Sequence, residues 1–467
     1  MATPISRAIC NSVKTRFGVR NYGAVSPAVN TANRAKVAET TAKDWKIIQN
    51  LDDSQLTRVV VAVRAGSRHE SRTNRGITHF LRHAIQIGNA NTFALNLYNT
   101  LEVVGSTFST NTGKETAYLC YSGSNQYGME AVEAVLRNVF RAGFSDLDWA
   151  AFAGCQNKML HDLQILSNQP NVKLMENLHS AAYRDTLGNP LYASRNFIGS
   201  FTKEQTSEFI QNHYSNNRVA IVTSGVDEEL YQSLTGCLDG FPHYAYNRKG
   251  AKSNDEKARY TGGEAREEKP DLDATYVAVA TEGPKLGSQE ALAAGVLQAV
   301  LGQGRRIKYS LNPEGPRLNT AVSKALGDTV FDTNALNINY SDSGLFGFVV
   351  AAPSDSINTA LSATTEAFAN VMKNGITDAE LQAGKTKLAT AVSMTLESKE
   401  ARMFSQAEQS LAGLPISTPD QIISQINKLT AADVNKVAKQ LSAGKFTMSS
   451  IGNLAGVPYL DELKDLN

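Results

Sequence analysis

The feature that most constrains the fold is an internal duplication, because similar local signals recur in the same order along the chain. Residues 143–146 (GFSD) and 375–378 (GITD) each carry a helix N-cap signal after a glycine, and they lie 232 residues apart. Residues 201–205 (FTKEQ) and 429–433 (LTAAD) have capping-box spacing and lie 228 residues apart. The nearly constant offset predicts two copies of one domain of about 200 residues.

Each predicted copy combines strands with long helices. An apolar strand opens each copy, at residues 59–63 and at residues 276–280. Amphipathic helices are expected at residues 130–140 and 357–372. We therefore predict an α+β fold made of two homologous sandwiches, with helices on one face of a largely antiparallel sheet.

A polar, charged and glycine-containing segment separates the two copies. It covers residues 247–273 and has the composition of an interdomain linker. The predicted domains are therefore residues 39–246 and residues 274–467.

The amino-terminal segment, residues 1–38, has a composition of its own. It contains six basic residues and no acidic one, and it is rich in serine, threonine and alanine. This profile is typical of a mitochondrial transit peptide, which is removed from the mature protein. The alternative is a basic tail without a targeting role.

The overall composition excludes several classes of protein. No apolar run reaches the 18 or so residues that a membrane-spanning helix needs, and a net charge of +1 gives no indication of nucleic-acid binding. The four cysteines are far apart and form no C-x-x-C pair, so we expect reduced thiols and no zinc ribbon, iron–sulfur cluster or haem. No cofactor is predicted.

Residues 79–83 (HFLRH) form the most informative motif for function. Two histidines four residues apart on a helix can bind one zinc ion, and a glutamate beside the second histidine would take a proton from the metal-bound water. This chain has Arg82 at that place. A guanidinium is always protonated and accepts no hydrogen bond, so the general base is missing.

The residues around the motif predict a helix that ends near Gly88. Apolar residues form one stripe, and the opposite stripe contains His79, Arg82, His83 and Gln86. Several interpretations of this polar stripe stay open: a solvated face, histidines hydrogen-bonded to nearby backbone, a weak residual metal site, or a working one.

These features together resemble the pitrilysin-type (M16) metallopeptidases, the family of the mitochondrial processing peptidase. The resemblance runs from about residue 54 to the carboxyl end. Its most specific stretches point to the non-catalytic core-protein branch, and they are residues 257–264 (KARYTGGE), 339–348 (NYSDSGLFGF), 452–454 (GNL) and 460–463 (LDEL).

The resemblance implies a degenerate zinc site. Active members take a third ligand from a helix that follows, and the matching segment here is residues 160–163 (LHDL). His79 and His83, with His161 or Asp162, are therefore remnant ligands, and we predict neither a bound metal nor a catalytic residue.

The resemblance also implies a role in assembly on the matrix side of the mitochondrial inner membrane. The implied partners are core protein 1 and other subunits of respiratory complex III, and a presequence peptide bound by strand addition is a further one. Two alternatives stay open, namely a presequence-binding partner of a processing peptidase and an active zinc peptidase that obtains its base elsewhere.

Overall fold

The computed structural model describes residues 36–42, 45–52, 54–89, 92–93, 99, 101–125, 149–239, 255–302 and 315–463. Most of the predicted transit segment, the helix expected at residues 130–140 and the N-cap signal at residues 143–146 lie outside these ranges. Residues 36–38 are described and begin the first strand.

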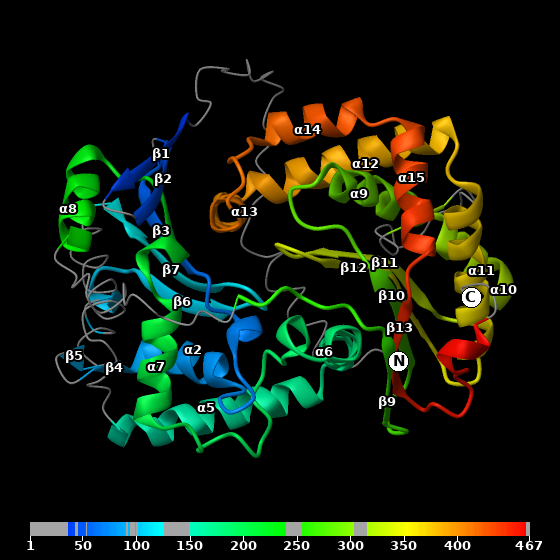
Figure 1. Cartoon of the computed structure of the whole chain (residues 1–467), viewed down its shortest axis with the longest axis horizontal. Coiled ribbons are helices and arrows are strands. Elements are labelled where there is room, and N and C mark those ends of the chain that lie inside the picture. The colour runs from blue at the N-terminus through cyan, green and yellow to red at the C-terminus, as the bar shows by residue number, and fades with distance from the viewer. Residues whose placement is uncertain are drawn as a thin grey trace, which may run out of the picture. The chain divides into compact units, whose positions relative to one another are not determined.

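The first half of the described chain forms a six-stranded sheet with the strand order β1-β2-β8-β3-β7-β6. Figure 1 shows this sheet with helices α2, α5 and α7 of the same half. Its strands are β1 (Lys36–Ala42), β2 (Trp45–Leu51), β3 (Leu56–Val63), β6 (Thr107–Thr112), β7 (Ala117–Ser124) and β8 (Val219–Ser224). A separate pair consists of β4 (Gly88–Asn89) and β5 (Thr92–Phe93). The helices are α2 (Ile77–Ile87), α5 (Trp149–Ser167), α6 (Pro170–Tyr183), α7 (Lys203–His213) and α8 (Glu228–Asp239), with 3-10 turns η1 (Ser67–His69), η4 (Thr186–Gly188) and η5 (Asn216–Arg218).

The second half forms a five-stranded sheet with the order β11-β12-β10-β13-β9. Its strands are β9 (Gly263–Glu268), β10 (Thr275–Glu282), β11 (Asp332–Asn339), β12 (Gly344–Ala352) and β13 (Phe446–Gly452). Its helices are α9 (Gln289–Leu301), α10 (Arg317–Leu326), α11 (Ile357–Asn374), α12 (Asp378–Glu397), α13 (Lys399–Leu411), α14 (Pro419–Lys428) and α15 (Ala431–Ser442), followed by the 3-10 turn η7 (Leu460–Glu462).

The two sheets confirm the predicted duplication. The order β2-β8-β3-β7-β6 in the first matches β9-β13-β10-β12-β11 in the second, strand for strand in chain order. Strand β2 pairs in parallel with β8, and β9 pairs in parallel with β13. The other neighbouring pairs among these matched strands are antiparallel. Thr202 and Thr430 cap α7 and α15 with complete capping boxes, as their shared spacing predicted.

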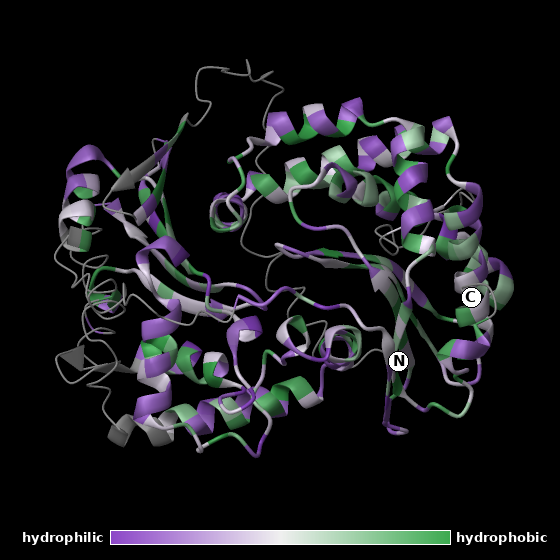
Figure 2. Ribbon diagram, in the orientation of Figure 1, coloured by the Kyte–Doolittle hydropathy of each residue, from purple (hydrophilic) through white to green (hydrophobic). Residues whose placement is uncertain are grey.

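Helices cover both faces of each sheet, whereas the sequence predicted one covered face. Alternate residues of β3 point to opposite sides: Val59, Val61 and Val63 pack with helices of their own half, and Val60 and Ala62 pack against α13 of the second half. Figure 2 shows hydrophobic and hydrophilic residues on the same helices, as expected of helices with one buried side.

The second sheet receives a helix from the first half in return. Leu174, Leu178 and Ala182 of α6 pack against Ala278 and Ala280 of β10. The halves therefore exchange helices, α6 in one direction and α13 in the other. Each sheet needs the other half to bury its second face.

The predicted linker also differs from the structure. Strand β9 lies inside residues 247–273 and pairs in parallel with β13, so part of this segment is an edge of the second sheet. Its charged residues are compatible with an edge strand, where one side faces solvent. Among the described residues, no helix is both long and apolar enough to cross a membrane.

Candidate functional site

The HFLRH motif lies on helix α2, as predicted. Glu70 caps its amino end, because its carboxylate accepts hydrogen bonds from the backbone N–H of Gly76 at 2.7 Å and of Thr78 at 3.0 Å. The apolar stripe is buried in the first core, and its members are Ile77, Phe80, Leu81, Ala84 and Ile85. The helix ends at Ile87, directly before Gly88.

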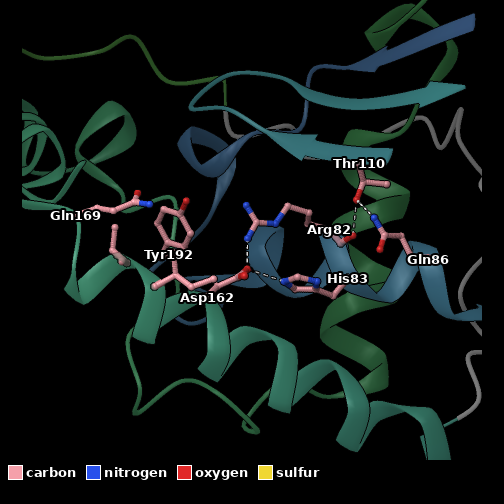
Figure 3. Close-up of a pocket in the computed structure, with 9 residues that line it drawn as sticks. Arg82, His83, Gln86, Thr110, Asp162, Gln169 and Tyr192 are labelled. Atoms are coloured by element: carbon pink, nitrogen blue, oxygen red, sulfur yellow. Dashed lines mark hydrogen bonds and ion pairs between the residues drawn. The ribbon is translucent and has the colours of Figure 1, made fainter. Parts of the chain in front are cut away.

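The polar stripe of α2 packs against α5 and is not a solvated face. The Nε2 atoms of His79 and His83 lie 3.1 and 2.8 Å from Oδ2 of Asp162, and Nη2 of Arg82 donates to the same oxygen. Figure 3 shows the contacts of Asp162 with Arg82 and His83. His79 is fully buried. One carboxylate oxygen thus accepts from three side chains of the neighbouring helix.

The acceptor fixes the protonation of both rings. An ionised carboxylate only accepts hydrogen bonds, so Nε2 carries a hydrogen in both His79 and His83. Nδ1 of His79 accepts from the backbone N–H of Ala193 at 3.2 Å, which keeps this nitrogen unprotonated. His79 is therefore a neutral imidazole whose two nitrogens are both occupied.

Burial and charge keep these groups in that state. Burial lowers the pKa of His79 to about 4, and the charge of Arg82 adds to the effect. Burial also lowers the pKa of His83, with further contributions from the charges of Arg82 and Lys158. For Asp162, burial acts to raise the pKa, but the hydrogen bonds from both histidines and the charge of Arg82 outweigh it, so its pKa is lowered.

The cluster contains the donor types that zinc prefers. One ligand atom from each of His79, His83 and Asp162 lies within 4.8 Å of the others, a spacing that one ion could bridge. Two features oppose this use: both Nε2 atoms would have to lose their hydrogens, and Arg82 already brings a positive charge to the shared oxygen. Metal-bound histidine normally donates from its other nitrogen, but Nδ1 of His79 faces a donor.

The structure separates the two residues that the sequence left as third-ligand alternatives. Asp162 joins the cluster, whereas His161 is exposed on α5 and does not. Sequence reasoning missed two residues of the site. Ala193 donates to His79, and the centroid of the Tyr192 ring lies 5.4 Å from Cζ of Arg82. Neither has a local signal, because both lie more than 100 residues beyond α2 in the chain.

A cavity of about 310 Å³ adjoins the cluster. It is lined by Arg82, His83, Gln86, Thr110, Asp162, Ile165, Leu166, Gln169 and Tyr192. Thr110 on the edge strand β6 donates to the backbone oxygen of Arg82 at 2.7 Å, so strand, helix and cavity meet at this position.

Comparisons with known proteins identify the family. Residues 47–195 match the model described as Insulinase (Peptidase family M16), and residues 200–388 match the Peptidase M16 inactive domain. The chain is 31% identical to cytochrome b-c1 complex subunit 2 of Homo sapiens over 421 residues, which cover 89% of this chain and 90% of that relative. The chain belongs to the M16 peptidase family.

Further M16 relatives agree with this placement. Identity is 30% to cytochrome b-c1 complex subunit 2 of Mus musculus, over 89% of this chain and 90% of that relative. It is 25% to the probable mitochondrial-processing peptidase subunit alpha-1 of Arabidopsis thaliana, over 94% of this chain and 86% of that relative. A chain of complex III2 from Candida albicans, solved with Inz-5 bound, has a TM-score of 0.79 at 17% identity and covers 92% of this chain and 100% of that chain, which shows a shared fold.

Proposed function

We propose that this protein is a structural subunit of mitochondrial respiratory complex III, with core protein 1 and other subunits of that complex as its partners. The observation that carries the proposal is the 31% identity to human cytochrome b-c1 complex subunit 2 over 89% of the chain. The fold shared with a chain of the Candida albicans complex supports it.

We further propose a peripheral position on the matrix side of the mitochondrial inner membrane. The basic, acid-free composition of residues 1–38 supports import into mitochondria. Attachment would then go through other subunits. Native gels of mitochondrial membranes test the proposal: the processed protein should co-migrate with complex III, and its depletion should lower the amount of assembled complex. A protein that migrates apart from the complex contradicts it.

We infer that the protein is not a peptidase and holds no metal at His79 and His83. Arg82 replaces the proton acceptor of the motif, and its charge opposes a dication at the same carboxylate. An ionised Asp162 accepts from both imidazole Nε2 atoms, which requires a hydrogen on each of them. Stoichiometric zinc together with chelator-sensitive cleavage of a presequence peptide would instead support the alternative of an active zinc peptidase.

A second candidate function is the binding of presequence peptides without turnover. The cavity beside Arg82 favours it, and so does strand β6, which is the last strand in the order of the first sheet. The test is peptide affinity without cleavage, which should be lost when proline replaces a residue of β6 whose N–H faces away from β7. Unchanged affinity in such a variant would contradict strand addition.

A further inference from the structure

The cavity beside the cluster has the size and lining of a small ligand pocket. Its volume of about 310 Å³ lies at the lower end of the range for such pockets. Two apolar side chains, Ile165 and Leu166, line it together with polar groups from α2, α5 and the segments around Gln169 and Tyr192. It therefore has room for the end of a chain and offers both apolar and polar contacts.

Three of the lining side chains have hydrogen-bond donors without an acceptor in the described part of the chain. Arg82 donates to Asp162 from Nη2, and its other guanidinium nitrogens donate to no described residue. The Gln169 amide and the Tyr192 hydroxyl have no hydrogen-bond partner among the described residues, and both residues line the cavity with Arg82 (Figure 3). None of these donor atoms is buried and unsatisfied. These three residues line the cavity and bring unused donors to its wall.

The charge around the cavity favours an anion. Arg82 lies in its wall, and Lys158 is close enough to act on His83 through its charge. Asp162 is the anion of the group, but its Oδ2 already accepts from three side chains. Arg82 and Lys158 are therefore two cations near one carboxylate.

We propose that this cavity binds the carboxylate at the end of a peptide, with Arg82 and Gln169 as donors and with the last side chain against Ile165 and Leu166. A guanidinium with unused N–H groups suits a carboxylate, which accepts two parallel hydrogen bonds. The inference rests on the peptide-binding function proposed above and names the group that the site would recognise. Arg82 would then serve as a binding residue at a position where active relatives activate water.

Two fluorescein-labelled tetrapeptides with leucine at the end test the proposal, one with a free carboxylate and one with an amide. Fluorescence anisotropy with the purified full chain should show at least ten-fold tighter binding of the free acid. Arg82→Gln should bind the free-acid peptide at least ten-fold more weakly than the unmodified protein. Gln169→Ala removes a side chain that forms no hydrogen bond with a described residue, and its affinity for the free-acid peptide should fall several-fold. Gln164→Ala on the exposed side of α5 is the matched control and should change nothing.

The outcomes separate this inference from the functions on which it builds. Equal binding of the two peptides, or full affinity in both Arg82→Gln and Gln169→Ala, overturns carboxylate recognition and leaves peptide binding standing. If neither peptide binds, both carboxylate recognition and peptide binding are overturned. Displacement of the labelled peptide by an equal concentration of acetate assigns the site to small carboxylic acids and contradicts a peptide end. Co-migration with complex III, the test of the assembly role, depends on none of these results.

Discussion

Arg82 donates from Nη2 to Oδ2 of Asp162, the oxygen that also receives hydrogen bonds from the two histidines of the motif. In a zinc site made of two histidines and a carboxylate, the metal ion supplies the positive charge. Here the positive charge comes from Arg82, which lies on α2 with the two histidines. The contact between α2 and α5 therefore includes a protein cation beside Asp162.

The first prediction concerns this internal cation. Arg82→Met should lower the free energy of unfolding by about 1.5–3 kcal/mol, the usual contribution of a hydrogen bond to a charged group. Arg82→Glu should destabilise more in the presence of a chelator, because two carboxylates then lie side by side. Zinc should raise the melting temperature of the glutamate variant, since that variant has an acidic ligand in place of the cation.

The unmodified protein is the reference for this experiment. Its melting temperature should stay the same with zinc and with chelator. A chelator-dependent melting temperature in the unmodified protein would contradict the inference that no metal is held. Strong peptidase activity from Arg82→Glu alone would show that the rest of the catalytic site is intact.

The second prediction concerns Arg68, which links the two halves. Its guanidinium forms a two-pronged pair with Asp342, donates to Glu115 at 2.6 Å and donates to the backbone oxygen of Glu256 at 2.8 Å. Its side chain is only 3% exposed. Arg68→Met leaves two carboxylates without their cation, so we expect a loss of about 3–5 kcal/mol.

Arg72 provides the matched control in the same segment. Its side chain is 83% exposed and forms an ion pair with Asp185 at 3.4 Å. Arg72→Met should change the free energy of unfolding by less than about 1 kcal/mol. Urea denaturation of both variants gives the comparison, and equal losses would show that the pair with Asp342 does not stabilise the two halves.

The duplication, the fold class and the cap positions could be predicted because they depend on local spacing. Thr202 and Thr430 read as N-caps from a few neighbouring residues, and both are. The choice between His161 and Asp162 could not be made, since adjacent helix positions point about 100° apart and only the packing of α5 on α2 decides which one faces the motif. The exchange of α6 and α13 was missed for a similar reason. The unbroken apolar run of residues 59–63 does indicate a strand buried on both faces, but not which helix covers the second one.

The third prediction follows from that exchange. Leu178 of α6 is fully buried against the second sheet, although it belongs to the first half of the chain. Leu178→Ala should lower the free energy of unfolding by about 2–5 kcal/mol and should speed hydrogen exchange in β10 and β13. Leu160→Ala, at a position that is 37% exposed on α5, should have a much smaller effect. Faster exchange confined to the first half would contradict the exchange of helices.

The last prediction concerns His179, which also links the two halves. Nδ1 donates to the backbone oxygen of Met175 at 2.6 Å, and Nε2 accepts from the Tyr340 hydroxyl at 2.7 Å. Both nitrogens of the neutral ring are therefore satisfied. Burial, with a contribution from the charge of Lys114, lowers the pKa of His179 from 6.5 to about 3.

Between these two pKa values the unfolded chain binds a proton that the folded chain does not, so stability must fall as the pH falls. The contribution of His179 is complete above pH 6.5 and decreases by about 1.4 kcal/mol for each pH unit below it. His179→Gln removes this group, so the unfolding free energy of that variant should depend less steeply on pH between about 6 and 4. His161→Gln, at an exposed position of α5, is the matched control for replacing a histidine by glutamine. Parallel profiles for His179→Gln and the unmodified protein would show that His179 takes up a proton in the folded state as readily as in the unfolded one.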